Sequence, residues 1–212
     1  MEIIPSILVS TEQELKNKLS LVQGLVERVH LDIADGIFVP NTTIDGYSQL
    51  AKIETNIAIT AHLMVSKPEN HIANWVDSIV DQVIFHIEAT NDPQRVIDMA
   101  KEGDLQVGVA LKPETPCDEI SSIVDQIDFV HFMTVEPGFY GADFVQDVVE
   151  KIQDFKFMYP DIPIQVDGGI TDQTAPALVE AGVTNFVVGS FLFDNKKLSI
   201  EEAVHQLQKA IE

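Results

Sequence analysis

The sequence predicts an α/β protein of the (β/α)8 barrel class, in which eight parallel strands close into a ring. Short β-branched apolar runs recur along the chain, and amphipathic stretches separate most of them. The runs begin about 20 to 35 residues apart, which is the size of one strand-helix unit. An open, doubly wound sheet is the alternative, but it usually has fewer strands and binds its ligand at one crevice. We therefore expect closure into a barrel.

The apolar runs have the length and composition of buried strands. The eight predicted strands cover residues 3–8, 29–33, 57–64, 82–87, 105–111, 127–135, 162–166 and 185–188. Between them, apolar residues recur at helical spacing. Helices are predicted at residues 12–22, 68–79, 93–101, 144–157 and 199–211. This alternation of strand and helix predicts a parallel sheet with helices packed on its outside.

Length and composition fit one domain covering residues 1–212. Apolar residues make up 45% of the 212 residues and charged residues 22%, as in an ordinary globular protein. No linker or low-complexity segment divides the chain. The domain is expected to fold alone or as a homo-oligomer.

Charge and cysteine content limit the partners and the compartment. The net charge of -21 argues against binding to nucleic acid or to an anionic membrane. No apolar segment approaches the ~20 residues of a membrane span, and the first residues lack the pattern of a secretory signal. Cys117 is the only cysteine, so no intrachain disulfide forms. A cytoplasmic protein acting on a small molecule is the expectation.

Polar residues at the ends of predicted strands indicate a metal site. His30 and Asp32 lie two apart on the second strand and therefore share a face, which we expect to be the barrel interior. His62 and Asp167 end the third and seventh strands, where barrel active sites are built. Two imidazoles and two carboxylates suit one divalent ion, with zinc the first expectation and iron, manganese or cobalt the alternatives.

The positions of the two aspartates predict the reaction type. The second and seventh strands lie well apart around the ring, so Asp32 and Asp167 should face each other across a pocket. Carboxylates on opposite sides of a substrate can remove a proton from one face of a carbon and return one to the other. The pair therefore predicts an epimerase or racemase.

Glycines at the ends of the last three strands predict a phosphate site. Barrels frequently bind phosphate with backbone N–H groups of these loops and the start of a short helix. Backbone donors are needed because the chain has only 13 Lys and Arg residues against 34 Asp and Glu residues. The segments concerned are Gly138-Phe139-Tyr140-Gly141, Gly168-Gly169 and Gly189-Ser190.

Together these segments resemble the ribulose-phosphate 3-epimerase family over nearly the whole chain. The residues that carry the resemblance are Pro5-Ser6-Ile7-Leu8, His30-Leu31-Asp32, Asp35-Gly36-Ile37-Phe38-Val39-Pro40-Asn41, His62-Leu63-Met64-Val65, Phe85-His86-Ile87-Glu88-Ala89, Ala110-Leu111-Lys112-Pro113, Met133-Thr134-Val135-Glu136-Pro137-Gly138-Phe139, Val166-Asp167-Gly168-Gly169-Ile170 and Gly189-Ser190.

The resemblance implies a TIM barrel of the ribulose-phosphate-binding type. It implies an isomerase of carbohydrate metabolism, in the pentose phosphate pathway, that interconverts D-ribulose 5-phosphate and D-xylulose 5-phosphate through a 2,3-enediolate. Asp32 would accept the proton at C3 and Asp167 would donate one. The implied metal ligands are His30, Asp32, His62 and Asp167, and the implied substrate contacts are Ser6, His62, Gly138, Phe139, Tyr140, Gly141, Gly168, Gly169, Gly189 and Ser190.

Three loop residues depart from the pattern of that family. Ala34 stands where the family usually has Met, Tyr140 replaces a Gly, and Ala142 replaces a Gln. These departures leave two alternatives open. The substrate could be a different ketose phosphate, such as allulose 6-phosphate, or the protein could be a non-catalytic barrel that binds a sugar phosphate. Another enzyme class on the same barrel is a further alternative; a Schiff-base aldolase would use Lys112.

Five further residues receive interpretations of their own. His131 has the parity of Met133, so we expect it to point into the barrel one layer deeper, in a structural role. His86 and Glu88 are interpreted as interior polar scaffolding. Met133 and Met64, at two strand ends, are expected either to line the pocket or to fill gaps in the core.

Overall fold

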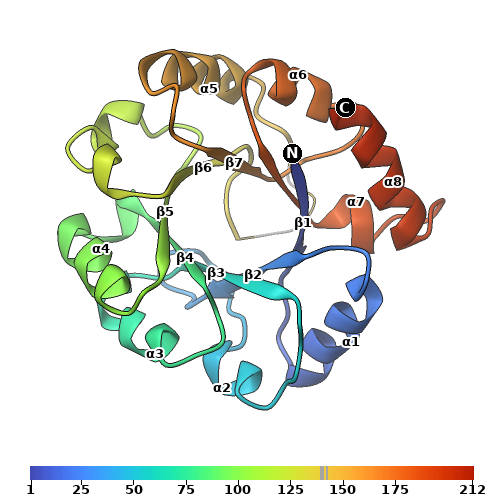
Figure 1. The fold of residues 1–212 in the computed structure, drawn as a ribbon, viewed down its shortest axis with the longest axis horizontal. Helices are drawn as coiled ribbons and strands as arrows, with labels where there is room; N and C mark the ends of the chain where they lie inside the picture. Colours follow the sequence, from blue (N-terminus) through green and yellow to red (C-terminus); the bar gives the residue numbers. More distant parts are fainter. Residues whose placement is uncertain (139–140, 142) are drawn as a thin grey trace.

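A closed barrel of eight parallel strands forms the centre of the molecule (Figure 1). The computed structural model describes residues 1–138, 141 and 143–212. Each strand pairs with the next in chain order, and β8 pairs with β1 to close the ring. The strands are β1 (Glu2–Ile7), β2 (Arg28–Ala34), β3 (Ala58–Met64), β4 (Gln82–His86), β5 (Gln106–Leu111), β6 (Phe129–Met133), β7 (Ile164–Asp167) and β8 (Asn185–Val188). All eight predicted strands are present, with ends that differ from the predicted ones by at most two residues, and the predicted fold class is confirmed.

Helices surround the barrel, and α8 lies beside α6 and α1 on the outside of the ring (Figure 1). They are α1 (Glu12–Val22), α2 (Tyr47–Leu50), α3 (Ile72–Val76), α4 (Pro93–Glu102), α5 (Asp147–Met158), α6 (Ala175–Glu180), α7 (Ser190–Phe193) and α8 (Ile200–Ile211). Thr11 and Ser199 begin α1 and α8 with capping boxes, in which each side chain accepts from a backbone N–H three residues on. None of the described helices is both long and apolar enough to cross a membrane.

The helix predictions were wrong in three respects. The segment predicted as one helix at residues 68–79 is a 3-10 turn, Pro68–Asn70, followed by α3. The helix predicted from residue 144 begins at Asp147, because the backbone N–H of Val145 donates to the carbonyl of Thr134 and holds this segment at the end of β6. Three short helices, α2, α6 and α7, were not predicted, because four to six residues are too few to show helical spacing.

Alternation along the strands separates the core from the barrel interior. One parity, exemplified by Leu31, Leu63 and Phe132, is fully buried and belongs to the main apolar core. The other parity points into the barrel and brings polar side chains there. This interior set includes His30, Asp32, His62, His86, His131, Gln165 and Asp167, all buried.

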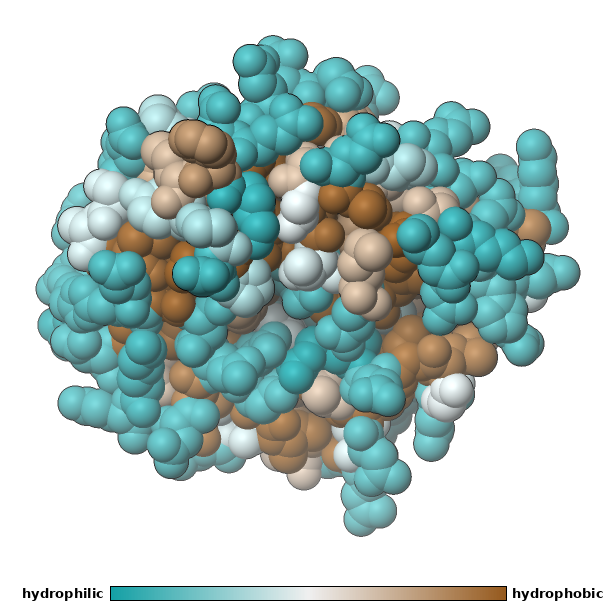
Figure 2. All heavy atoms as spheres, turned by 45° about the horizontal axis from the view of Figure 1, so that its top comes forward, coloured by the Kyte–Doolittle hydropathy of each residue, from teal (hydrophilic) through white to brown (hydrophobic). Residues whose placement is uncertain are grey.

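Hydrophilic side chains cover most of the face drawn in Figure 2, with smaller apolar patches between them. This surface matches the large excess of acidic over basic residues. The apolar side chains are accordingly gathered between barrel and helices, where they hold the strand ends that carry the polar groups.

Candidate active site

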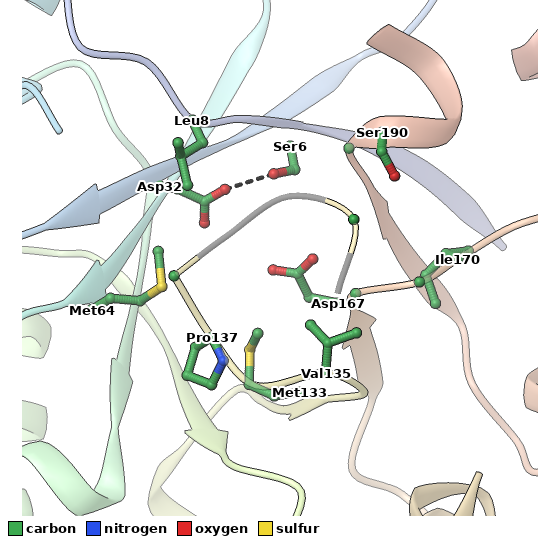
Figure 3. Close-up of a pocket in the computed structure, with 15 residues that line it drawn as sticks. Ser6, Leu8, Asp32, Met64, Met133, Val135, Pro137, Asp167, Ile170 and Ser190 are labelled. Atoms are coloured by element: carbon green, nitrogen blue, oxygen red, sulfur yellow. Dashed lines mark hydrogen bonds between the residues drawn. The ribbon is translucent and has the colours of Figure 1, made fainter. Parts of the chain in front are cut away.

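A cleft opens at the carboxyl ends of the strands (Figure 3). Most of the predicted site residues line it: Ser6, Asp32, Gly138, Gly141, Asp167, Gly168, Gly169, Gly189 and Ser190. His30 and His62 lie behind this lining, fully buried, and both contact Asp32. Phe139 and Tyr140, together with Ala142, lie outside the described residues. Met64 and Met133 both line the cleft.

Asp32 is held in place by side chains from the two strands that flank β2. Ser6 on β1 donates its Oγ hydrogen to Asp32 Oδ2 at 2.6 Å, and His62 Nδ1 on β3 lies 2.8 Å from Asp32 Oδ1. The sheet register places His62 directly beside Asp32, which explains the second contact. Both carboxylate oxygens therefore have a hydrogen-bond partner inside the protein, and only 4% of the residue is exposed.

The surroundings of Asp32 favour its ionised form. Burial by itself raises the pKa of a carboxyl group, but the neighbouring imidazoles of His30 and His62 outweigh burial and hold the pKa of Asp32 well below its usual range. Conversely, although burial lowers the pKa of His30, the charge of Asp32 raises it above its ordinary value. Asp32 is thus an anion ready to accept a proton or to bind a cation.

Asp167 reaches the same cleft from the other side. It ends β7, and β8 and β1 lie between β7 and β2 in the ring. Figure 3 shows the carboxylates of Asp32 and Asp167 entering the cleft from opposite walls. His30 Nε2 lies 3.7 Å and His62 Nδ1 4.0 Å from Asp167 Oδ2, so the imidazoles lie within reach of both carboxylates.

The four residues predicted as metal ligands come together, and His131 joins them. One ligand atom each from His30, His62, His131 and Asp167 lies within 4.8 Å of the others, and Asp32 Oδ1 lies 3.3 Å from His30 Nε2. Among the described residues, both ring nitrogens of His30 and Nε2 of His131 have no hydrogen-bond partner. Buried imidazole nitrogens without partners are unfavourable, and a cation at their centre would satisfy them. The donor set therefore fits a borderline divalent metal.

Burial also suits His62 to coordination. Burial, assisted by the neighbouring His30 and His131, lowers the pKa of His62 well below its ordinary value, so the ring is neutral. Its far nitrogen, Nε2, lies 2.9 Å from Nε2 of His86, and His86 Nδ1 lies 3.3 Å from Glu88 Oε2. His86 therefore supports His62 directly, in the way that outer groups orient metal-binding histidines.

Sequence reasoning assigned His86 and His131 to scaffolding, and their closeness to the ligand cluster was missed. Strand parity had placed His131 in the interior, but parity does not say how far a side chain reaches along the barrel axis. The sequence did contain a signal for the position of His131. His131 precedes Met133 by two residues and Gln165 precedes Asp167 by two residues, so both point inward beside the site.

The glycine loops after β6, β7 and β8 form part of the cleft lining. Gly138, Gly168 and Gly169 all have positive φ, and a Cβ on Gly168 would lie 2.3 Å from Cγ2 of Val135. Gly189 immediately precedes the short helix α7, which begins at Ser190. None of the described lining residues is Lys or Arg, in keeping with anion binding through the backbone.

Lys112 does not line the cleft. Its Nζ lies 3.4 Å from Glu136 Oε1 and 4.9 Å from the centre of the Phe38 ring. A Schiff base at Lys112 would form away from Asp32 and Asp167, so the geometry gives no support to an aldolase of that type.

Comparison with known sequences shows the family of the chain. Residues 2–193 match the model of the "Ribulose-phosphate 3 epimerase family". A ribulose-phosphate 3-epimerase from Bacillus subtilis (strain 168) is 35% identical, covering 95% of this chain and 97% of the relative. One from Oryza sativa subsp. japonica, named as a cytoplasmic isoform, is 33% identical, covering 100% and 94%.

Comparison with solved structures confirms the fold. A 3-hexulose-6-phosphate synthase superposes with a TM-score of 0.76 and covers 100% of both chains, at 16% sequence identity. At that identity the likeness concerns the barrel and not the chemistry.

Proposed function

Because the chain belongs to the ribulose-phosphate 3-epimerase family, we propose that it inverts C3 of a ketose phosphate, D-ribulose 5-phosphate giving D-xylulose 5-phosphate. The observation that carries the proposal is the pair of carboxylates, Asp32 and Asp167, that enter one cleft from opposite walls (Figure 3). The name of the rice relative supports a cytoplasmic setting.

Asp32 is the proton acceptor in this proposal and Asp167 the donor. Burial raises the pKa of Asp32, but the imidazoles of His30 and His62 lower it by more, so the carboxylate is ionised before the reaction. Removal of the C3 proton on one face gives a 2,3-enediolate, and Asp167 delivers a proton to the other face. Two separate carboxylates are needed because a single base returns its proton to the face from which it came.

The residues proposed to hold a divalent metal are His30, Asp32, His62 and Asp167. Two imidazoles and two carboxylates fit zinc first, with iron, manganese and cobalt as alternatives. Such an ion supplies Lewis-acid stabilisation of the negative charge that develops on the substrate oxygens. Ser6 and His62 hold Asp32 at its two oxygens and so orient it toward C3.

The phosphate is proposed to bind among the backbone N–H groups of the last three strand ends. Gly138, Gly141, Gly168, Gly169, Gly189 and Ser190 line this part of the cleft. The proposed contacts of Phe139 and Tyr140 come from the same loop. Binding through the backbone places a doubly charged group in a strongly acidic protein without a lysine.

The deciding experiment is proton exchange in heavy water. D-Ribulose 5-phosphate is incubated with the purified, metal-loaded protein, and C3 is followed by NMR. We expect D-xylulose 5-phosphate with solvent deuterium at C3. Asp32→Asn should abolish exchange and a chelator should reduce it, whereas Asp98→Asn, an exposed position on α4, should leave it unchanged.

A second candidate substrate is a six-carbon ketose phosphate such as D-allulose 6-phosphate. Ala34 packs with Val39 and Met64 beside the cleft, and a methyl group there leaves more room than the longer side chain usual in the family. The same exchange assay with both sugars separates the two. Absence of exchange with either sugar in the folded, metal-loaded protein would leave a non-catalytic binder and refute the proposed function.

A further inference from the structure

Among the described residues, the ring of His131 has one hydrogen-bonding neighbour. His131 is fully buried on β6, and its register partner on β7 is Gln165. His131 Nδ1 lies 2.8 Å from Gln165 Oε1. A carboxamide oxygen only accepts hydrogen bonds, so Nδ1 carries the hydrogen and the lone pair of a neutral ring is on Nε2.

That Nε2 atom faces the cluster of metal ligands. It has no hydrogen-bond partner among the described residues, and it lies 3.7 Å from Asp167 Oδ2. His30 Nε2 lies at the same distance, 3.7 Å, from the same oxygen. Ligand atoms at ~2.0–2.2 Å from one ion lie about 3–4 Å from each other, so His131 is placed as His30 is.

A purely structural role explains this arrangement less well. The register partner of His131 on β5 is Ala110, which packs with Ile84 and Phe129 in a buried apolar cluster. An apolar side chain at position 131 would extend that cluster and bury no polar nitrogen. The distance of 3.7 Å to Asp167 is too long for a hydrogen bond, so the contact does not satisfy Nε2 either.

We propose that His131 is an additional ligand of the metal, beyond the four that the family resemblance assigns, and that Gln165 is the residue that positions it. This inference rests on the metal binding in the proposed function. Three imidazoles make the site richer in nitrogen than two. Imidazole favours zinc, cobalt, nickel and copper, whereas an oxygen-rich set suits manganese or magnesium. The site should therefore discriminate more strongly against manganese than a site with two histidines.

Metal binding to chelator-treated protein tests the proposal without any assay of activity. Zinc, cobalt(II) and manganese affinities are measured by competition titration, and the visible absorption of the cobalt form reports its ligands. Loss of His131 in His131→Leu should lower zinc affinity at least ~10-fold, lower manganese affinity less, and change the cobalt spectrum. His205→Ala, which removes an exposed histidine on α8, should change none of these.

Variants of Gln165 test its positioning role. Gln165→Glu keeps an acceptor for Nδ1–H and should retain the cobalt spectrum, whereas Gln165→Met removes it and should move the spectrum toward that of His131→Leu. Should these variants fail to fold, the wild-type protein labelled with 15N-histidine and loaded with 113Cd gives the answer by NMR. Coupling of cadmium to three ring nitrogens is expected.

Different results would contradict the proposed metal ligand and the proposed function. Coupling to two ring nitrogens, or unchanged affinity and spectrum in folded His131→Leu, would overturn the role of His131 and leave the epimerase intact. Metal bound by three imidazoles in a protein that exchanges no ketose phosphate would refute the proposed function alone. A folded wild-type protein that binds no metal would overturn both.

Discussion

At the scale of single residues, the environment of each acidic group decides what it can do. Asp32 and Asp167 are the same amino acid at the ends of two strands, but Asp32 has both oxygens engaged by Ser6 and His62. The imidazoles of His30 and His62 counter the cost of burial and keep the pKa of Asp32 low. A base of fixed orientation results, and its partners become targets for mutation.

Ser6→Ala is expected to lower kcat/KM about 10-fold, because Asp32 Oδ2 loses the hydroxyl that donates to it at 2.6 Å. Loss of a donor also disfavours the ionised carboxyl, so the acid limb of the pH profile should move to higher pH. Steady-state kinetics across pH checks both effects. Ser10→Ala, an exposed serine after the same strand, is the control and should behave as wild type. Equal kinetics in Ser6→Ala and wild type would contradict a role for Ser6 in holding Asp32.

At the scale of elements, contacts between neighbouring strand ends hold the loops of the site. Thr134, after β6, donates its hydroxyl to the carbonyl of Gly168 after β7. Glu88, after β4, accepts from the backbone N–H of Lys112 and the hydroxyl of Thr115 after β5. The loops after β6 and β4 are thus each tied to the loop that follows the next strand around the ring.

Gly168→Ala should lower the free energy of unfolding by about 2–4 kcal/mol. A positive φ of 110° costs roughly 1 kcal/mol for alanine, and the added Cβ would lie 2.3 Å from Val135. Gly24→Ala is the matched control, since Gly24 has a φ of 79° but nothing within 4 Å of the new Cβ. It should lose only about 1 kcal/mol. Urea titration measures the free energy of unfolding of both variants. Equal losses in the two variants would mean that Val135 moves away from the added Cβ at Gly168.

Glu88 predicts a pH-dependent contribution to stability. Burial raises its pKa, but the hydrogen bond with His86 and those from Lys112 and Thr115 lower it from 4.5 to about 2. A lowered folded-state pKa means that this stabilisation is present above pH 4.5 and is lost as pH falls toward about 2. Glu88→Gln should therefore be less stable than wild type by about 1–2 kcal/mol at neutral pH, allowing for solvent screening. The difference, measured by urea unfolding, should shrink below pH 4; a difference independent of pH would contradict it.

At the scale of the whole molecule, ring closure and net charge act on all parts at once. Pairing of β8 with β1 makes every strand an interior strand, and it brings all carboxyl ends to one face. With a net charge of -21, the acidic side chains of the folded protein repel one another. An anionic ligand in the cleft would therefore be bound by backbone N–H groups rather than by lysines.

Added salt should stabilise the folded protein. Screening of 34 acidic side chains against 13 basic ones reduces repulsion in the compact state. Between about 0.02 and 0.5 M sodium chloride we expect the free energy of unfolding to rise by the order of 1 kcal/mol. Urea unfolding at each salt concentration measures this, because urea adds no ions. Lower stability at high salt would show that attractive ion pairs, such as Arg28 with Asp81, outweigh repulsion.

The sequence by itself determined the barrel, because strand composition and strand-helix alternation are local patterns that repeat. It also determined that His30, Asp32, His62 and Asp167 share the interior, since parity within a strand fixes the face. It did not reveal α2, α6 and α7, which are held by contacts rather than by a long periodic pattern.

Only the tertiary structure decided which interior residues meet. Strand register and the reach of each side chain set the distances that place His86 behind His62 and His131 beside Asp167. These depend on the shear and tilt of a closed ring, which no short stretch of sequence encodes. The sequence therefore specified which groups enter the barrel, and closure of the barrel specified how they combine.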